Sequence, residues 1–164
     1  MAKNNIENIK IENARIVFRN LSGKPDKFNP QGGKRSFSVV IEDPEFANEL
    51  KREGWNIKQF NQSPDSDEEP AHFISVKVSY NNIPPHIYLC TSKNKTLLNE
   101  DTVGQLDYAE ISNVDIVITP YQYEMSGRSG ISAYVKTMYV TVVEDEFASK
   151  YEYDDLDDEE IPFA

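Results

Sequence analysis

The sequence predicts a mainly β domain, a small barrel or sandwich with one helix, followed by a disordered acidic tail. Three observations support this prediction. Several segments within residues 1–143 alternate apolar and polar side chains with the two-residue period of a half-buried strand. Residues 43–54 carry both the start and the stop signal of a helix. Residues 144–164 are acidic and show no apolar period, which is typical of chain that stays solvated.

The sequence of residues 8–42 predicts two strands joined by a long loop. Residues 8–18 (NIKIENARIVF) are β-branched and roughly alternating, and we expect a bulge at Asn13 that changes which side chains face the core. Residues 22–34 contain three glycines and two prolines, which indicates a loop. Residues 35–42 (RSFSVVIE) alternate again.

The helix prediction rests on a complete set of end signals. Asp43 can cap the N-terminus, and the proline after it suits the first helical position. Phe46 and Leu50 share one face at a spacing of four residues, and Gly54 can end the helix. We expect Phe46, Leu50 and Trp55 to pack in the core. An acidic loop, SPDSDEEP, follows at residues 63–70.

The next strand is the clearest in the chain. Residues 71–80 (AHFISVKVSY) place apolar residues at alternate positions, so one face is buried and the other, with Phe73 and Lys77, faces solvent. Further strands are predicted at residues 86–91, 114–123 and 131–144. The last two flank the glycine-containing loop EMSGRSG, so they are expected to form a long hairpin.

The net charge of −11 is distributed unevenly. Residues 144–160 hold ten acidic residues and one basic residue, which gives −9, whereas residues 1–143 hold 16 basic and 18 acidic residues. Four of those acids lie in the loop at 63–70. Residues 15–35 hold six basic residues against Asp26 alone. The domain is therefore nearly neutral with one basic stretch, and the acidity belongs to the tail.

Composition excludes several classes of protein. One cysteine, Cys90, cannot form a disulfide framework, and with only two histidines it cannot form a zinc site. No stretch approaches the roughly 18 apolar residues of a membrane helix. No phosphate-binding loop, metal-ligand spacing or catalytic triad occurs, so we expect no enzyme, no metal and no cofactor. An intracellular protein with reduced cysteine is expected.

The tail ends in an apolar tip. Pro162 limits the entropy lost on docking, and Phe163 can fill a pocket to which the preceding acids steer the tail. The run DDLDDEEIPF resembles the C-terminal tip of bacterial single-stranded-DNA-binding proteins, except that Ala164 follows the phenylalanine here. The resemblance implies that the tip recruits replication, recombination and repair proteins and can fold back on the DNA groove. The implied partner-binding residues are Asp157, Asp158, Glu159, Glu160, Ile161, Pro162 and Phe163.

The body is similar to another group. The segment FRNLSGKPDKFNPQGGKRSFSVVIED at residues 18–43 resembles the single-stranded-DNA-binding proteins of tailed bacteriophages, which pair a divergent OB fold with an acidic tail. The resemblance implies an OB-fold-like DNA-binding domain over residues 1–143, a tail over 144–164, and action in the host bacterial cytoplasm. A helix directly after residues 35–42 departs from the simplest OB order, in which it lies between the third and fourth strands. Self-association is left open.

A groove for single-stranded DNA needs cations for the phosphates and flat rings for the bases. The loop at residues 22–34, called the basic loop below, supplies both kinds of residue and is expected to form one wall of the groove. The TSKNKT loop and the hairpin loop are expected to form the other wall. Phe37, at the start of an alternating strand, is assigned to the core rather than to the groove. The predicted DNA-binding residues are Arg19, Lys24, Lys27, Phe28, Lys34, Arg35, Phe73, Lys77, Lys93, Lys95, Tyr121, Tyr123 and Arg128.

Two alternatives remain at this level. In the first alternative, the protein is an acidic interaction protein or DNA mimic that blocks a host DNA-binding enzyme, although mimics spread their charge over the folded surface. The same groove also suits RNA, because nothing in the sequence reads a 2′-hydroxyl.

Overall fold

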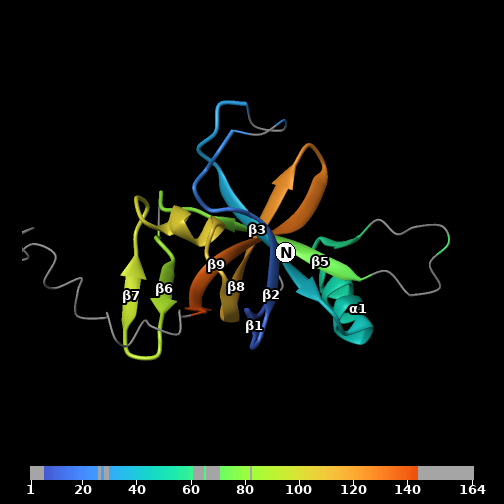
Figure 1. The fold of residues 1–164 in the computed structure, drawn as a ribbon. Coiled ribbons are helices and arrows are strands. Elements are labelled where there is room, and N and C mark those ends of the chain that lie inside the picture. Colours follow the sequence, from blue (N-terminus) through green and yellow to red (C-terminus); the bar gives the residue numbers. More distant parts are fainter. Residues whose placement is uncertain are drawn as a thin grey trace, which may run out of the picture.

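The computed structural model describes residues 6–25, 27, 30–60, 65, 71–81 and 83–143 (Figure 1). Within them the chain is mainly β with one α-helix, as the sequence predicts. The tail at residues 144–164 lies outside the described residues. The elements are β1 (Ile9–Ile11), β2 (Arg15–Asn20), β3 (Arg35–Ile41), α1 (Pro44–Glu53), β4 (Ile57–Gln59), β5 (His72–Val78), β6 (His86–Cys90), β7 (Lys95–Leu98), the 3-10 helix η1 (Val103–Asp107), β8 (Ile111–Met125) and β9 (Arg128–Val142).

The strands form one sheet that curls back on itself. Its hydrogen-bonded path runs β1-β8-β9-β5-β3-β2, and β6 adds to β9 with β7 beside it. The path is open, but its first and last members, β1 and β2, are consecutive in the chain. All pairs are antiparallel except β5–β9 and β6–β9, which are parallel. A curled sheet of this order is OB-fold-like.

The irregularity expected at Asn13 separates the two ends of that path. Asn13 has a φ of 54°, in the left-handed region that asparagine tolerates. The backbone N–H of Ala14 donates to the carbonyl of Val114 at 2.7 Å. The predicted strand at 8–18 is therefore split, so that its first half pairs with β8 and its second half with β3.

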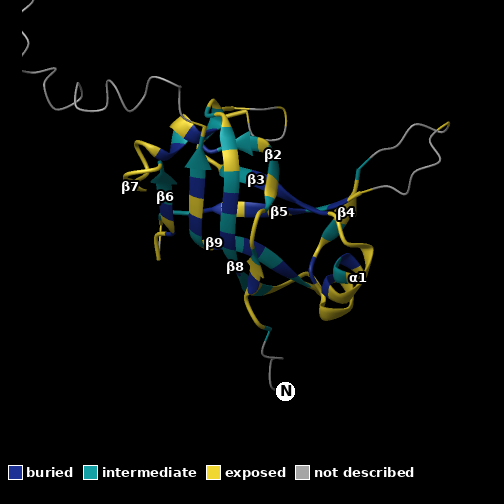
Figure 2. Cartoon of the chain, turned by 60° about the horizontal axis from the view of Figure 1, so that its bottom comes forward, coloured by how far each residue is buried: buried dark blue, intermediate teal, exposed yellow. Residues whose placement is uncertain are grey.

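The core lies inside the curl. The β3–β5 register places Phe37 opposite Val76 and Val39 opposite Ile74, and all four side chains are buried. The alternation predicted for residues 71–80 is confirmed, because every second residue from His72 to Val78 is buried. Figure 2 shows the same alternation as bands along β8 and β9. β5, β8 and β9 therefore keep a second row of side chains on the outside of the sheet. The alternation predicted for residues 35–42 is not seen in β3, whose residues 37–41 are all buried because this strand is covered on both faces.

The helix has the predicted limits. The Asp43 carboxylate accepts from the N–H of Glu45 at 3.0 Å, and Gly54 ends the helix with a φ of 106°. Leu50 and Trp55 are buried, whereas Phe46 is half-buried against the core. α1 follows β3 directly, which is the departure from the simplest OB order that the sequence predicts. None of the helices that the structure describes is long and apolar enough to span a membrane.

Two predictions about loops are wrong, and a short strand was missed. Residues 124–130 do not form a loop: β8 and β9 meet at a two-residue turn, Ser126-Gly127, whose φ angles of 51° and 80° match the twist of a tight hairpin. Arg128 is consequently the first residue of β9. Lys95 begins β7, which pairs with β6, so it too is not in a loop. The short strand β4 at Ile57–Gln59 was not predicted, because three residues carry too little periodicity.

Candidate nucleic-acid interface

A lysine and a tyrosine from distant parts of the chain meet on the outside of the sheet. The alternation of β5 turns Phe73, Ser75 and Lys77 away from the core. The parallel β5–β9 register then sets Lys77 beside Tyr134. The Lys77 Nζ lies 5.8 Å from the centroid of the Tyr134 ring, within the range of a cation–π contact. The pair offers one ring and one positive charge side by side.

Three phenylalanines form a cluster further along the same face. The Phe73 ring lies 4.5 Å from Phe60 and 5.8 Å from Phe18, measured between centroids. Phe18 lies where the β2–β3 register shifts, has a φ of 54° and is 65% exposed. Since Phe73 and Lys77 are four residues apart on one strand, they are separated by about 13 Å.

Two tyrosines of β8 extend this surface toward the hairpin tip. The Tyr121 ring packs edge-on against Tyr134 at 6.1 Å and remains 61% exposed. Tyr123, the next outward residue of β8, lies across Gly130 of β9, where an added Cβ would come within 2.6 Å of the Tyr123 hydroxyl. Gly130 is thus required for the position of this ring. We call Phe18, Phe60, Phe73, Lys77, Tyr121 and Tyr134 the aromatic face.

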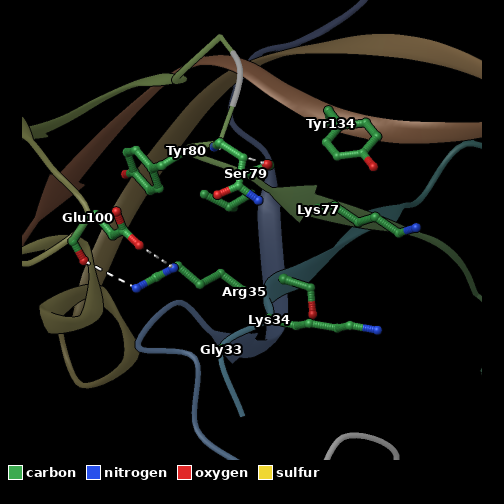
Figure 3. Close-up of a pocket in the computed structure, with 11 residues that line it drawn as sticks. Gly33, Lys34, Arg35, Lys77, Ser79, Tyr80, Glu100 and Tyr134 are labelled. Atoms are coloured by element: carbon green, nitrogen blue, oxygen red, sulfur yellow. Dashed lines mark hydrogen bonds and ion pairs between the residues drawn. The ribbon is translucent and has the colours of Figure 1, made fainter. Parts of the chain in front are cut away.

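A polar pocket of about 380 Å³ adjoins the aromatic face at Lys77 and Tyr134 (Figure 3). Arg35 lies along its floor, where its Nη1 is 3.5 Å from a carboxylate oxygen of Glu100. In Figure 3, Lys34 and Lys77 extend to the side opposite Arg35 and Glu100, below Tyr134. Three cations against one carboxylate make this pocket suited to an anion such as a phosphate.

Burial affects the groups at the bottom of this pocket. The Nε of Arg35 and the hydroxyl of Tyr80 are buried, and neither has a hydrogen-bond partner among the described residues. Burial raises the pKa of Tyr80, Arg35 acts to lower it, and Glu100 adds to the rise. Burial and Glu100 thus both favour the neutral phenol of Tyr80, whose ring centroid lies 5.8 Å from the Arg35 guanidinium.

Arg19, one of the predicted DNA-binding residues, makes hydrogen bonds within the fold. Its Nη1 donates to the carbonyls of Leu106 and Ala109 at 2.7 and 2.8 Å, so its charge holds η1 against β2. Asp107 holds the same region from the other side, because its carboxylate accepts from the N–H of Leu21 and from Ser22. Burial acts to raise the pKa of Asp107, but these hydrogen bonds and nearby Lys24 lower it overall. Together they anchor the start of the basic loop.

The other predicted residues are spread over the surface. Lys24 lies over the ring of Tyr108 at 4.1 Å, and Lys95 lies over two tyrosines of β6 and β9. Lys27, Lys93 and Arg128 are exposed. Phe28 and the tail residues 157–163 lie outside the described residues. Among the described residues, the structure thus gathers Lys34, Arg35, Phe73, Lys77 and Tyr121 at one place, with Tyr123 next to Tyr121 along β8, and leaves the other predicted residues elsewhere.

Sequence reasoning missed three rings of the aromatic face. Tyr134 alternates with buried Ala133 and Val135, so the rule that selected Phe73, an aromatic residue on the polar side of a strand, also applies to it. Phe18 and Phe60 carried no comparable signal, because a register shift and a contact across the fold bring them to Phe73.

Comparison with known proteins relates the whole chain to one group. A family model described as "Putative phage ssDNA-binding domain" matches residues 1–162. No curated protein matches the sequence. The chain is similar in fold to the single-stranded DNA-binding protein from bacteriophage Enc34 in complex with ssDNA, with 18% identity, a TM-score of 0.54, and coverage of 86% of this chain and 89% of that one. A C-terminal truncation of the Enc34 protein gives 17% identity, a TM-score of 0.52 and coverage of 85% and 88%.

Proposed function

Because this chain belongs to the phage ssDNA-binding family, we propose that its aromatic face binds single-stranded DNA with little sequence preference. The observation that carries this proposal is the row of partly exposed rings with Lys77 among them and a cationic pocket beside it. Proteins of this family bind DNA rather than catalyse a reaction on it. As a phage protein acting on exposed DNA, it would work in the host bacterial cytoplasm during replication, recombination or repair.

In the proposed mechanism, the base and the phosphate of each nucleotide make different kinds of contact with the protein. Bases stack on the exposed ring of Phe18 and the half-buried rings of Phe73 and Tyr134, and each stacked base contributes about 1–3 kcal/mol. Phosphates lie against Lys34 and Lys77 at the polar pocket. Every base has a π-face, and a phosphate carries no sequence information, so neither contact discriminates strongly between sequences.

The test of this function is a titration of end-labelled oligonucleotides followed by fluorescence anisotropy. The single tryptophan, Trp55, is only 3% exposed, so a labelled nucleic acid reports binding more directly than intrinsic tryptophan emission. We expect oligo-dT to bind and a duplex of equal length to bind far more weakly. Binding of oligo-rU with the same affinity would extend the function to RNA. A protein that binds none of the three would instead fit the DNA mimic.

We further propose that the tail at residues 144–164 competes with DNA for the cationic pocket and recruits replication or recombination proteins when DNA displaces it. Its charge of −9 and its apolar tip, Ile161-Pro162-Phe163, support this proposal. The charge is opposite in sign to that of Lys34, Arg35 and Lys77 around the pocket. The competition and the recruitment follow from the same charge and the same tip.

A truncation to residues 1–143 is expected to bind oligo-dT more tightly than the full chain at low salt, and the difference is expected to shrink as salt rises. The measurement is the anisotropy titration at several salt concentrations. For the truncated protein, the logarithm of affinity is expected to fall with the logarithm of salt at a slope of about −0.7 per neutralised phosphate. Equal affinities of the two proteins at low salt would contradict the competition.

A further inference from the structure

A second group of stacked rings and a cation lies outside the aromatic face. Tyr88 of β6 and Tyr139 of β9 are direct partners in the parallel β6–β9 pair. Their rings are 4.9 Å apart and nearly parallel, with 11° between their planes. Lys95 of β7 lies over both, 4.8 Å from the Tyr88 centroid and 5.6 Å from that of Tyr139. Tyr139 is 37% exposed, so the group is accessible to a flat ligand.

The surface between this tyrosine pair and the aromatic face is hollow. A cavity of about 650 Å³ lies against Tyr121 and Tyr134 at one end and against His86 at the other. His86 is two residues before Tyr88 on β6 and pairs with Thr137 of β9. Lys136 also lines this cavity and adds a positive charge. The cavity therefore extends from the aromatic face to His86, two residues before Tyr88, and so points toward the tyrosine pair without including it in its lining.

The other side of Tyr139 is less suited to DNA. A smaller hollow there has two carboxylates, Glu12 and Asp115, and one ammonium group in its lining, because Lys10 pairs with Glu12 at 3.9 Å; its charge is therefore net negative. Asp115 accepts a hydrogen bond from the N–H of Asn13 at 3.0 Å, which holds its charge at that edge. Repulsion from these acids favours a path for a polyanion toward β6 and Lys95 rather than toward β1. In Figure 1 the β6–β7 hairpin projects on the side of the molecule opposite α1.

We propose that single-stranded DNA continues from Tyr134 through this cavity to a second binding subsite, in which a base stacks on Tyr139 and a phosphate contacts Lys95. Tyr134 and Tyr139 are five residues apart on β9, but the extra residue that β9 inserts between Val135 and Thr137 brings both to the outside of the sheet, about 13 Å apart along the strand. A short oligonucleotide occupies the aromatic face alone, whereas a longer one reaches both places. This inference rests on the proposed function and adds to it a binding site with two parts.

The experiment compares two lengths of end-labelled oligo-dT, one of about five and one of about twelve nucleotides, within the range of site sizes of OB folds. Tyr139→Ala is expected to weaken binding of the longer oligonucleotide about 5- to 150-fold, the equivalent of one lost stack, and to leave the shorter one unchanged. Tyr139→Phe keeps the ring and is expected to match the wild type at both lengths.

The charge is tested separately. Lys95→Gln is expected to reduce the salt slope by about 0.7 for the longer oligonucleotide only. Lys51→Gln on the exposed side of α1 removes the same charge away from the path and serves as the matched control. The shorter oligonucleotide and the melting temperature report on folding of each variant.

Two results would overturn the second subsite. One is that Tyr139→Ala and Lys95→Gln each bind both lengths of oligo-dT with the affinity of the wild type. The other is an equal loss at both lengths, which indicates a general defect rather than a second contact. Failure of the proposed function looks different, because the wild-type protein would then bind neither oligonucleotide.

Discussion

Tyr134→Ala is expected to lower the affinity for oligo-dT of either length about 5- to 150-fold. The ring belongs to the aromatic face, touches Tyr121 edge-on and lies beside Lys77, so its removal takes away one stacking surface and the support of a cation. The loss corresponds to about 1–3 kcal/mol, the contribution of one stacked base. The measurement is anisotropy at a single fixed salt concentration.

Tyr134→Phe is the matched control, since it keeps the ring and removes only the hydroxyl. It is expected to bind like the wild type, whereas Lys77→Gln is expected to bind more weakly and with a salt slope reduced by about 0.7. Tyr134 is half-buried on the outside of the sheet, so the alanine variant is expected to stay folded. Undiminished binding by folded Tyr134→Ala would place the DNA elsewhere on the molecule.

Phe37→Ala is expected to have the opposite pattern: a large loss of stability and no loss of affinity in the folded fraction. Phe37 is 1% exposed and packs inside the curled sheet, opposite Val76. Removing a buried phenylalanine side chain costs about 3–5 kcal/mol, because the cavity left behind is only partly filled. The measurement is urea unfolding, with the midpoint shifted to lower urea at an unchanged slope.

The companion variant is Phe18→Ala, which removes the same side chain from an exposed position. It is expected to change stability little, because the Phe18 side chain is mostly in water, and to weaken DNA binding. If Phe37→Ala retained its stability but lost affinity, the assignment of Phe37 to the core would be wrong. The pair therefore separates rings that hold the fold from rings offered to the ligand.

Phe37 and Phe73 show how far the sequence could separate these two roles. The sequence alternation assigns Phe37 to the core and Phe73 to the outward row, and the structure has both there, although β3 is buried on both faces from residue 37 to 41 and only β5 alternates. The helix ends were predictable for a similar reason: Asp43 and Gly54 satisfy the backbone groups of their own helix. Alternation along a strand and capping of a helix both depend on residues that are only a few positions apart in the sequence.

The candidate site was predictable only in part. Lys34, Arg35, Phe73, Lys77 and Tyr121 were identified by charge or by position on a strand, and the fold gathers them. Arg19 was selected by its charge in the same way, yet its guanidinium donates hydrogen bonds to the carbonyls of Leu106 and Ala109. The neighbouring sequence does not distinguish a basic side chain that faces a ligand from one that donates hydrogen bonds to another part of the chain.

The sequence by itself determined the longer strands, the helix with both of its ends and the charge on each segment, including the −9 of residues 144–164. These properties depend on neighbouring residues. Only the tertiary structure decided which ring lies beside which cation. Lys77 meets Tyr134 through the parallel β5–β9 register, and Phe18 reaches Phe73 through a register shift in β2. Pairing between distant strands is set by packing of the whole core, so a surface made from several strands exists only once the sheet has curled around that core.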